Sequence, residues 1–471
     1  MSTEIDHMLS RHGERYRWLV TVTAMVGTLS MSLSSTIINV ALPRIMADFQ
    51  IGHTDVQWLS TAFLASMTVG MLVNAWCLSR FGLKNTYRGA LLVFLCASAA
   101  GGLAPSFETL IAVRAVQGLT AGLVQPLALL IIYRVFPIEQ RGRSVGFYGM
   151  GVILAPTLGP VLGGALVDIW HWRAVFLVVV PPSLTALVLG SRYLFRGQED
   201  GERRRLDWPG LVLLAAWLVA LLWGLSNGPR LGWDATEVVA ALAGGLLALG
   251  LFAARELTCR DPLLALAVFR RPGFKGAFGV AMITGAGLFS SVYLLPLLVQ
   301  TVLGFSPTKA GLMLMPAGLA MGLIYPFVGR LADRHSVGLM GAVGLVGFMV
   351  AAVALSVCAG GASFFWLMTW AILTRVACAF LMPPVVVAAM ALLDEPLVNQ
   401  GAGVISFARQ LGGAFGITLV AVVLQEHAAL FAFGAGAGAG QGYRDAFILL
   451  ALLFAVGLVS LSSLARGSRR P

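Results

Sequence analysis

Charge is what this sequence has least of. Only 11% of its 471 residues are Asp, Glu, Lys or Arg, while 58% are hydrophobic and the mean hydropathy is +0.86. An average soluble domain has about 25% charged and about 45–50% apolar residues. The composition therefore excludes a water-soluble globular protein and predicts an all-α integral membrane protein.

Motifs of catalysis and metal binding are also missing. The chain has no His/Glu metal spacing, no nucleotide-binding glycine loop followed by Lys-Ser/Thr, and no nucleophile elbow. Its five cysteines have neither paired nor metal-like spacing, so we interpret them as small buried hydrophobic residues. We therefore expect no enzyme activity, no catalytic residue, no cofactor and no metal.

Long apolar runs, by contrast, recur from Trp18 to Leu464. A bilayer core about 30 Å thick needs about 20 apolar residues for each helical span. Because the first run has no small-residue cleavage site behind it, we expect it to remain as a transmembrane helix. Breaks at charged and turn residues predict fourteen spans, near 18–42, 56–78, 88–104, 108–133, 144–167, 174–195, 209–227, 236–254, 276–302, 308–331, 337–358, 364–391, 401–424 and 444–465.

The spans predict a division of the chain into three parts. Residues 1–195 form an N-terminal six-helix bundle, 196–275 hold cytoplasmic linkers and two extra transmembrane helices, and 276–471 form a C-terminal six-helix bundle. Similar loops, 77–82 and 329–334, close the second span of each bundle. Such an internal repeat is typical of transporters built around a central cavity.

The net charge of +11 is unevenly placed. Most of the 32 Lys and Arg residues lie in the two terminal tails and in alternate loops. By the positive-inside rule these regions are cytoplasmic, so we expect a multi-pass protein of a bacterial inner membrane with both termini in the cytoplasm. Clusters such as Arg203 to Arg205 are expected to fix topology and to contact anionic membrane lipid, and their placement argues against nucleic-acid binding.

Five short motifs follow one another along the chain. They are 35–43 at the end of helix 1, Arg114 to Gly118 in helix 4, 155–164 in helix 5, 171–176 after it, and 406–413 in helix 13. The ordered set resembles the major facilitator superfamily, and within it the fourteen-helix drug:proton antiporters of the multidrug efflux type. The resemblance implies two six-helix bundles plus two extra central helices, and proton-driven export by alternating access.

Within these motifs Arg114 is the most informative residue. A charged side chain deep in a span costs several kcal/mol and needs a wet cavity or a partner. Gln117, one turn away on the same face, is placed to steady it. Two interpretations stay open for Arg114: structural pairing with a carbonyl or polar neighbour, or a part in coupling or substrate contact.

The resemblance also implies gating roles for small residues and loops. Glycine and proline in helix 5 let helices pack closely and bend, and in a rocking transporter the packed seam is itself the gate. An acid, a base and a tight turn would clamp the cytoplasmic helix ends. The residues concerned are Gly118, Gly159, Pro160, Gly163, Gly164, Arg80, Gly82, Lys84, Gly329, Asp333, Arg334 and Arg409.

Two departures from the family pattern bear on function. Ser34 stands where these antiporters usually have an aspartate in helix 1, and Ser79 replaces the acid of the first loop clamp. No carboxylate replaces Ser34 at mid-membrane depth, where a proton carrier or a counter-ion for a cationic drug usually lies. Glu108 and Asp168 are the acids closest to that depth.

Three interpretations follow from the missing acid. The substrates could be neutral, zwitterionic or anionic, with arginines making the cavity positive; protons could act through Glu108 or Asp168; or coupling could be weak or absent. We favour the first with some proton coupling retained. The candidates for the substrate cavity are Ser34, Thr36, Asn39, Gln57, Trp58, Gln300, Trp370 and Arg375.

The sequence thus predicts a secondary active transporter that exports a small, drug-like or metabolite molecule, with protons as the driving partner. The alternatives are an exporter of an anionic lipid or siderophore-like metabolite, and a transporter-like sensor that moves nothing. A periplasmic adaptor and outer-membrane channel are compatible partners, although no residue demands them.

Overall fold

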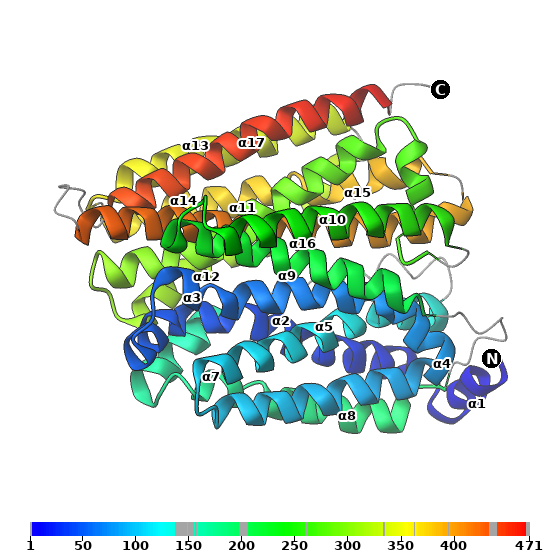
Figure 1. The fold of residues 1–471 in the computed structure, drawn as a ribbon. Helices are drawn as coiled ribbons and strands as arrows, with labels where there is room; N and C mark the ends of the chain where they lie inside the picture. The colour runs from blue at the N-terminus through cyan, green and yellow to red at the C-terminus, as the bar shows by residue number, and fades with distance from the viewer. Residues whose placement is uncertain are drawn as a thin grey trace.

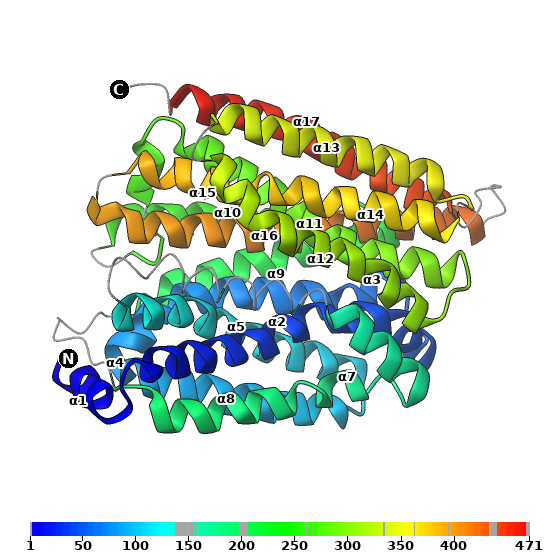
Figure 2. The same cartoon turned by 180° about the vertical axis from the view of Figure 1, so that it is seen from behind.

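The computed structural model is helical throughout the residues that it describes. These are 2–136, 148, 155, 158–196, 206–259, 262–264, 266–332, 335–361, 363–393, 395–432 and 440–467. No strand occurs among them. The helices run roughly parallel to one another, and the two chain ends lie at the same end of the bundle (Figures 1 and 2). We name this end the termini end and the opposite one the far end.

The N-terminal half lies at the bottom of Figure 1. Its long helix α2 contains six Ser and Thr residues between 28 and 36 that are mostly buried. Several of them donate to the carbonyl one turn back and so add little polarity to the helix surface. The elements are α1 (Ser2–His12), α2 (Arg15–Phe49), α3 (His53–Val56), α4 (Trp58–Gly102), α5 (Phe107–Val135), the helix Leu158–Ile169, α7 (Ala174–Leu177) and α8 (Val180–Tyr193).

Gly82 divides α4 into two arms. Its backbone angles, φ 72° and ψ 169°, belong to a region that is open essentially only to glycine. Thr86 donates to the Gly82 carbonyl at 2.8 Å and to the Cys77 carbonyl at 3.1 Å, which stabilises the turn. The chain therefore reverses at the termini end and returns to the far end by residue 102.

The C-terminal half lies above the first in Figure 1. Stacking of Phe348 on Phe454, with ring centroids 3.7 Å apart, joins two of its helices. Its elements are η1 (Leu266–Arg270), α11 (Phe274–Thr301), α12 (Pro307–Ala332), α13 (Val337–Cys358), α14 (Phe364–Ala379), α15 (Met382–Ala391), α16 (Glu395–Ala432) and α17 (Gln441–Gly467).

Two more helices, α9 (Trp208–Leu231) and α10 (Thr236–Thr258), form a hairpin between the halves. Helix α9 contacts both: Gln57 of the N-terminal half donates to Ser226 at 2.8 Å, and Trp217 packs against Phe415 of α16. Helix α10 packs mainly on α9 and leaves apolar side chains such as Leu247, 65% exposed, on its outer face. That face suits contact with lipid.

Two buried carboxylates lie at the base of this hairpin, and neither was among the candidate residues of the sequence analysis. Asp207 bonds to Arg255 at 2.6 Å, and Glu256 accepts the backbone N–H groups of Leu263 and Leu264. Asp207 and Glu256 are only 5% and 4% exposed. They fix the linker that leads into the C-terminal half.

Twelve helices among the described residues are long and apolar enough to cross a membrane. Two predicted spans are not among the twelve. The span 88–104 corresponds to the second arm of α4. Half of the span 144–167 lies outside the described residues, and its described helix is Leu158–Ile169. The structure therefore supports a multi-pass helical membrane protein.

Candidate functional site

The guanidinium of Arg114 lies inside the N-terminal half, among α2, α4 and α5. It is 1% exposed, and its Nε donates to the Leu59 carbonyl at 2.8 Å. Its Nη1 donates to the Ser34 carbonyl, the Ser34 hydroxyl and the Gln117 Oε1 at 3.1, 3.0 and 3.0 Å. The Phe63 ring covers it at 4.3 Å. The structure thus brings Ser34, Arg114 and Gln117 together.

Among the described residues, no carboxylate forms an ion pair with this buried charge. The sequence has no Asp or Glu between Glu14 and Asp48 or between Asp55 and Glu108, which covers the interiors of α2 and α4. The Nη2 of Arg114 is buried and has no hydrogen-bond partner. An uncompensated charge of this kind is costly, and removing one partner of a buried ion pair typically costs about 3–5 kcal/mol for that reason. The site therefore holds a fixed positive charge.

A second buried arginine, Arg375 on α14, lies in the other half. It is 7% exposed and its Nη1 donates to the Leu288 carbonyl of α11 at 3.2 Å. Arg409 of α16 has a buried Nε without a partner. Neither arginine forms an ion pair with another described residue. Among the described residues, Arg114, Arg375 and Arg409 are thus held by neutral groups or by none.

The glycines of the helix Leu158–Ile169, which is the predicted fifth span, lie where this helix closely approaches its neighbours. A Cβ at Gly159 would overlap the Thr36 hydroxyl, and one at Gly163 would come within 2.8 Å of Ile37, both on α2. A Cβ at Gly164 would overlap the Pro307 carbonyl, and one at Gly311 would overlap the Pro160 carbonyl. The first two contacts are within the N-terminal half and the last two join the halves.

Gly118 makes the same kind of close approach inside the N-terminal half, where a Cβ would overlap the Phe63 carbonyl of α4. This brings α5 against α4 directly below Arg114. Packing through small residues is how helices approach closely in membranes.

Four hydrogen bonds between described residues join the two halves directly. Three lie at the far end: Gln300 donates to the Val40 carbonyl, Tyr293 to the His53 carbonyl, and the Thr308 N–H to Asp168. The fourth, from Gln410 of α16 to the Met67 sulfur of α4, lies near the middle. Among the described residues, the halves are therefore closed against each other from the far end to mid-depth.

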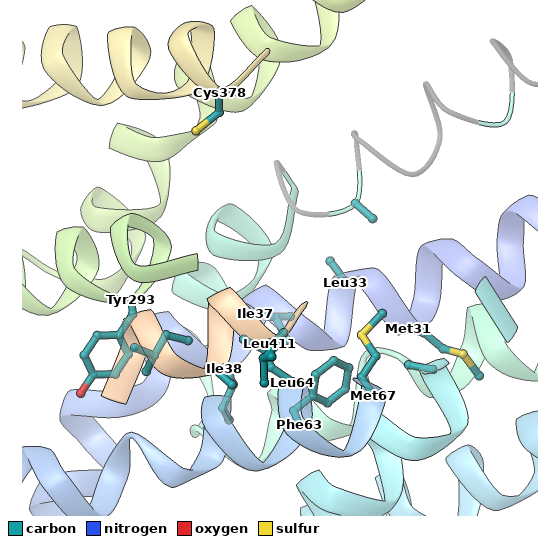
Figure 3. Packing of buried hydrophobic residues seen from close by; sticks show 14 of the residues in the cluster. Met31, Leu33, Ile37, Ile38, Phe63, Leu64, Met67, Tyr293, Cys378 and Leu411 are labelled. Carbon is teal, nitrogen blue, oxygen red and sulfur yellow. The ribbon is translucent and has the colours of Figure 1, made fainter. Parts of the chain in front are cut away.

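Apolar side chains fill the same seam. Figure 3 shows Leu411 of α16 beside Leu64 and Phe63 of α4 and Ile37 of α2. A Cβ at Gly413 would come within 3.2 Å of Leu64, so α16 and α4 approach closely at this level. The seam is lined by apolar side chains at this level.

The remaining cavity candidates do not share one surface. Asn39 accepts the Ser60 hydroxyl at 2.7 Å and is buried within the N-terminal half, while Gln57 faces α9. Trp58 is partly buried at the start of α4. Trp370 stacks on Trp366, which is 58% exposed, so this pair lies on the outer side of α14.

The predicted loop clamps are described in part. Arg80 is exposed, Gly82 forms the turn of α4, and Gly329 lies in the last turns of α12 with nothing within 4 Å of a Cβ. Lys84 is partly buried. Asp333 and Arg334 lie outside the described residues.

Several residues at the seam were not among the candidate site residues, although Gln410 lies within the motif 406–413. Gly311, Gln410 and the aromatic pair His53 and Tyr443, whose rings meet edge to face at 6.4 Å, all join the halves. A glycine, a glutamine or a tyrosine within an apolar run is common. Only the pairing of distant segments makes these positions informative.

Two helical halves that meet along a seam, with twelve helices among the described residues long and apolar enough to cross a membrane and with buried basic groups inside, are typical of a polytopic membrane transporter. The model of the Major Facilitator Superfamily matches residues 24–417, and the chain belongs to this superfamily. Its members are transporters rather than enzymes.

Relatives of stated function include antibiotic resistance proteins. The chain is 30% identical to the methylenomycin A resistance protein of Streptomyces coelicolor over 88% of both chains. It is 28% identical to the tetracenomycin C resistance and export protein of Streptomyces glaucescens, over 86% of this chain and 76% of that protein. A POT family transporter solved with 5-aminolevulinic acid shares the fold, with a TM-score of 0.69, 13% identity and 97% of both chains covered.

Proposed function

We propose that this protein is a secondary active exporter of small molecules that are neutral, zwitterionic or anionic. The observation that carries the substrate class is the buried guanidinium of Arg114, which has Ser34 and Gln117 as neighbours where a cation exporter would need a carboxylate. Arg375 adds a second buried positive charge in the other half. Both charges disfavour a cation and favour a substrate with an acceptor or negative group.

Export is supported by the resistance proteins among the relatives, one of which is named as an export protein. Alternating access is supported by the seam: its contacts close the far end, and a cycle requires them to break while the termini end closes. In the proposed orientation both termini are cytoplasmic, in the inner membrane of a bacterium, and the far end faces outward.

The proposal includes the fourteen-helix topology and the proton gradient as driving force. The two arms of α4 and the helix Leu158–Ile169, taken with the twelve candidate spans, support the count. A fluorescent protein fused to the C-terminus should fold and fluoresce in cells, because both ends lie in the cytoplasm. A fusion protein that is expressed at a normal level but does not fluoresce would refute the proposed orientation.

The test of function is transport into everted membrane vesicles, whose lumen corresponds to the outside and is acidified by respiration. Compounds matched in size, one each that is cationic, neutral and anionic, are offered with and without a protonophore. We expect gradient-dependent uptake of the neutral or anionic compound, lost in Arg114→Ala. The Arg88→Ala variant, at an exposed arginine of α4, controls for loss of a positive charge.

Uptake of the cation alone would refute the proposed substrate class. Uptake that is equal with and without the protonophore would refute proton coupling but not export. If no compound of a broad panel moves, a transporter-like sensor becomes the better interpretation.

A further inference from the structure

A carboxylate of one half caps a helix of the other at the far end. The Asp168 Oδ2 accepts the Thr308 backbone N–H at 2.9 Å. Asp168 belongs to the helix Leu158–Ile169 of the N-terminal half, and Thr308 is the second residue of α12 in the C-terminal half. The first N–H groups of a helix have no partner within it, and its N-terminus carries partial positive charge. From the other half, Asp168 accepts a hydrogen bond from one of these N–H groups and places a negative charge beside the N-terminus of α12.

The backbone brings the two groups together. Gly164 is one turn before Asp168 on the same helix face, and it touches the Pro307 carbonyl so closely that a Cβ would overlap it. Gly311, one turn into α12, touches the Pro160 carbonyl in the same way. The two helices therefore meet without intervening side chains, and the short Asp168 side chain reaches the end of α12.

The other charged groups at this place have partners of their own. The Lys309 ammonium lies over the Phe305 ring at 3.9 Å and near the Phe364 ring, both in its own half. His171 lies 3.4 Å from Asp48, which also accepts the Trp172 N–H. Of these groups, Asp168 alone makes a hydrogen bond between the halves.

We propose that Asp168 is a gating residue: its charged carboxylate, docked on the N-terminus of α12, holds the far end closed and sets the balance between the two states of the transporter. The contact exists only while the far end is shut, so every opening must break it. Asp168 is exposed to water, which weakens the interaction, so this charge-assisted hydrogen bond favours the closed state by about tenfold at most. The proposal rests on the proposed function only in requiring that the halves rock.

The experiment measures distances between pairs of spin labels by double electron–electron resonance spectroscopy, with the protein in lipid nanodiscs. The labels are attached to a variant in which the five native cysteines have been replaced. One label pair, at Leu103 and Phe365, reports the far end. The other, at Phe81 and Leu339, reports the termini end. All four side chains are at least 50% exposed, so labels should not disturb packing.

Two kinds of variant remove the contact from opposite sides. Asp168→Ala removes the acceptor, and Asp168→Asn keeps an acceptor oxygen but loses the charge. Thr308→Pro removes the donor N–H and leaves Asp168 intact, and proline pairs already occur in the first turns of α8 and α15. Glu237→Gln, an exposed carboxylate in the first turn of α10, is the matched control.

We expect the ratio of open to closed far end to rise about tenfold in Asp168→Ala and Thr308→Pro, and about threefold in Asp168→Asn, because the helix-dipole attraction alone is smaller. The termini-end distance should shorten in the same variants. A purely structural role would instead broaden both distances without this opposite change.

Unchanged distances in Asp168→Ala and Thr308→Pro, or equal changes in Glu237→Gln, would overturn the proposal. The measurement needs no substrate, so it is independent of the export assay. A shift of the far-end distance together with failed export would leave the gate standing and refute only the proposed function.

Discussion

Replacing Ser34 by Asp should stabilise this protein, against the usual effect of adding a charge to a membrane helix. The Ser34 hydroxyl lies 3.0 Å from the Arg114 Nη1, and Nη2 has no partner. Two opposite charges 4 Å apart attract by roughly 4 kcal/mol at an effective dielectric constant of 20. Desolvation of the new carboxylate offsets part of this, so we expect a net gain of about 1–3 kcal/mol.

The assay is thermal unfolding of purified protein in detergent, followed by intrinsic tryptophan fluorescence. Four proteins form a double-mutant cycle: wild type, Ser34→Asp, Arg114→Gln and the double variant. We expect Ser34→Asp to raise the midpoint by roughly 2 °C or more, since about 1 kcal/mol shifts it by about 2–4 °C in proteins of 150–250 residues and by less in longer chains. In the Arg114→Gln background the same change should lower it, because the carboxylate is then buried alone.

Ser34→Asn is the control for size, because it adds similar volume without charge. The reasoning fails if Ser34→Asp lowers the midpoint equally in both backgrounds, which would mean no coupling between positions 34 and 114. A second consequence can be read in vesicles: with its positive charge neutralised, the Ser34→Asp variant should gain uptake of the cationic compound.

Three further outcomes are expected. Gly311→Leu should reduce export at least tenfold at normal expression, since its Cβ would overlap the Pro160 carbonyl, whereas Gly244→Leu, with nothing within 4 Å, should export normally. Gly82→Ala should lower stability in thermal unfolding by about 1–3 kcal/mol, because φ is 72° there. Gln57→Leu should lower it by about 0.5–1.5 kcal/mol through loss of the bond to α9, and a midpoint unchanged from wild type would contradict this.

The apolar pattern predicted most of the helices, because each span must be apolar along its whole length whatever it packs against. The predicted spans 209–227 and 236–254 lie within α9 and α10, for example. Gly164 was named through the resemblance of residues 155–164 to the helix 5 motif of exporters, and the structure places it against the Pro307 carbonyl.

The pairings between segments could not be predicted in this way. The partner of Asp168 is a backbone N–H 140 residues away. Every residue except proline offers such a group, so no side chain at 308 signals it. The burial of Asp207 and Glu256 likewise results from the α9–α10 hairpin closing over its own linker. Asp207 and Glu256 lie just outside the predicted spans 209–227 and 236–254, but nothing in the sequence indicates which groups surround them.

The way in which the two deep arginines are held limits how protons can act. Arg114 and Arg375 each donate to a backbone carbonyl, Leu59 and Leu288 respectively, and neither forms an ion pair with a described residue. A carbonyl does not exchange protons, so these contacts cannot bind and release one during a cycle. If a gradient drives export, its effect would enter at titratable groups nearer the ends of the spans, and Asp168 is such a group whose carboxylate accepts a hydrogen bond across the two halves. Proton coupling in this protein would then act on the gate rather than on a carrier at mid-membrane depth.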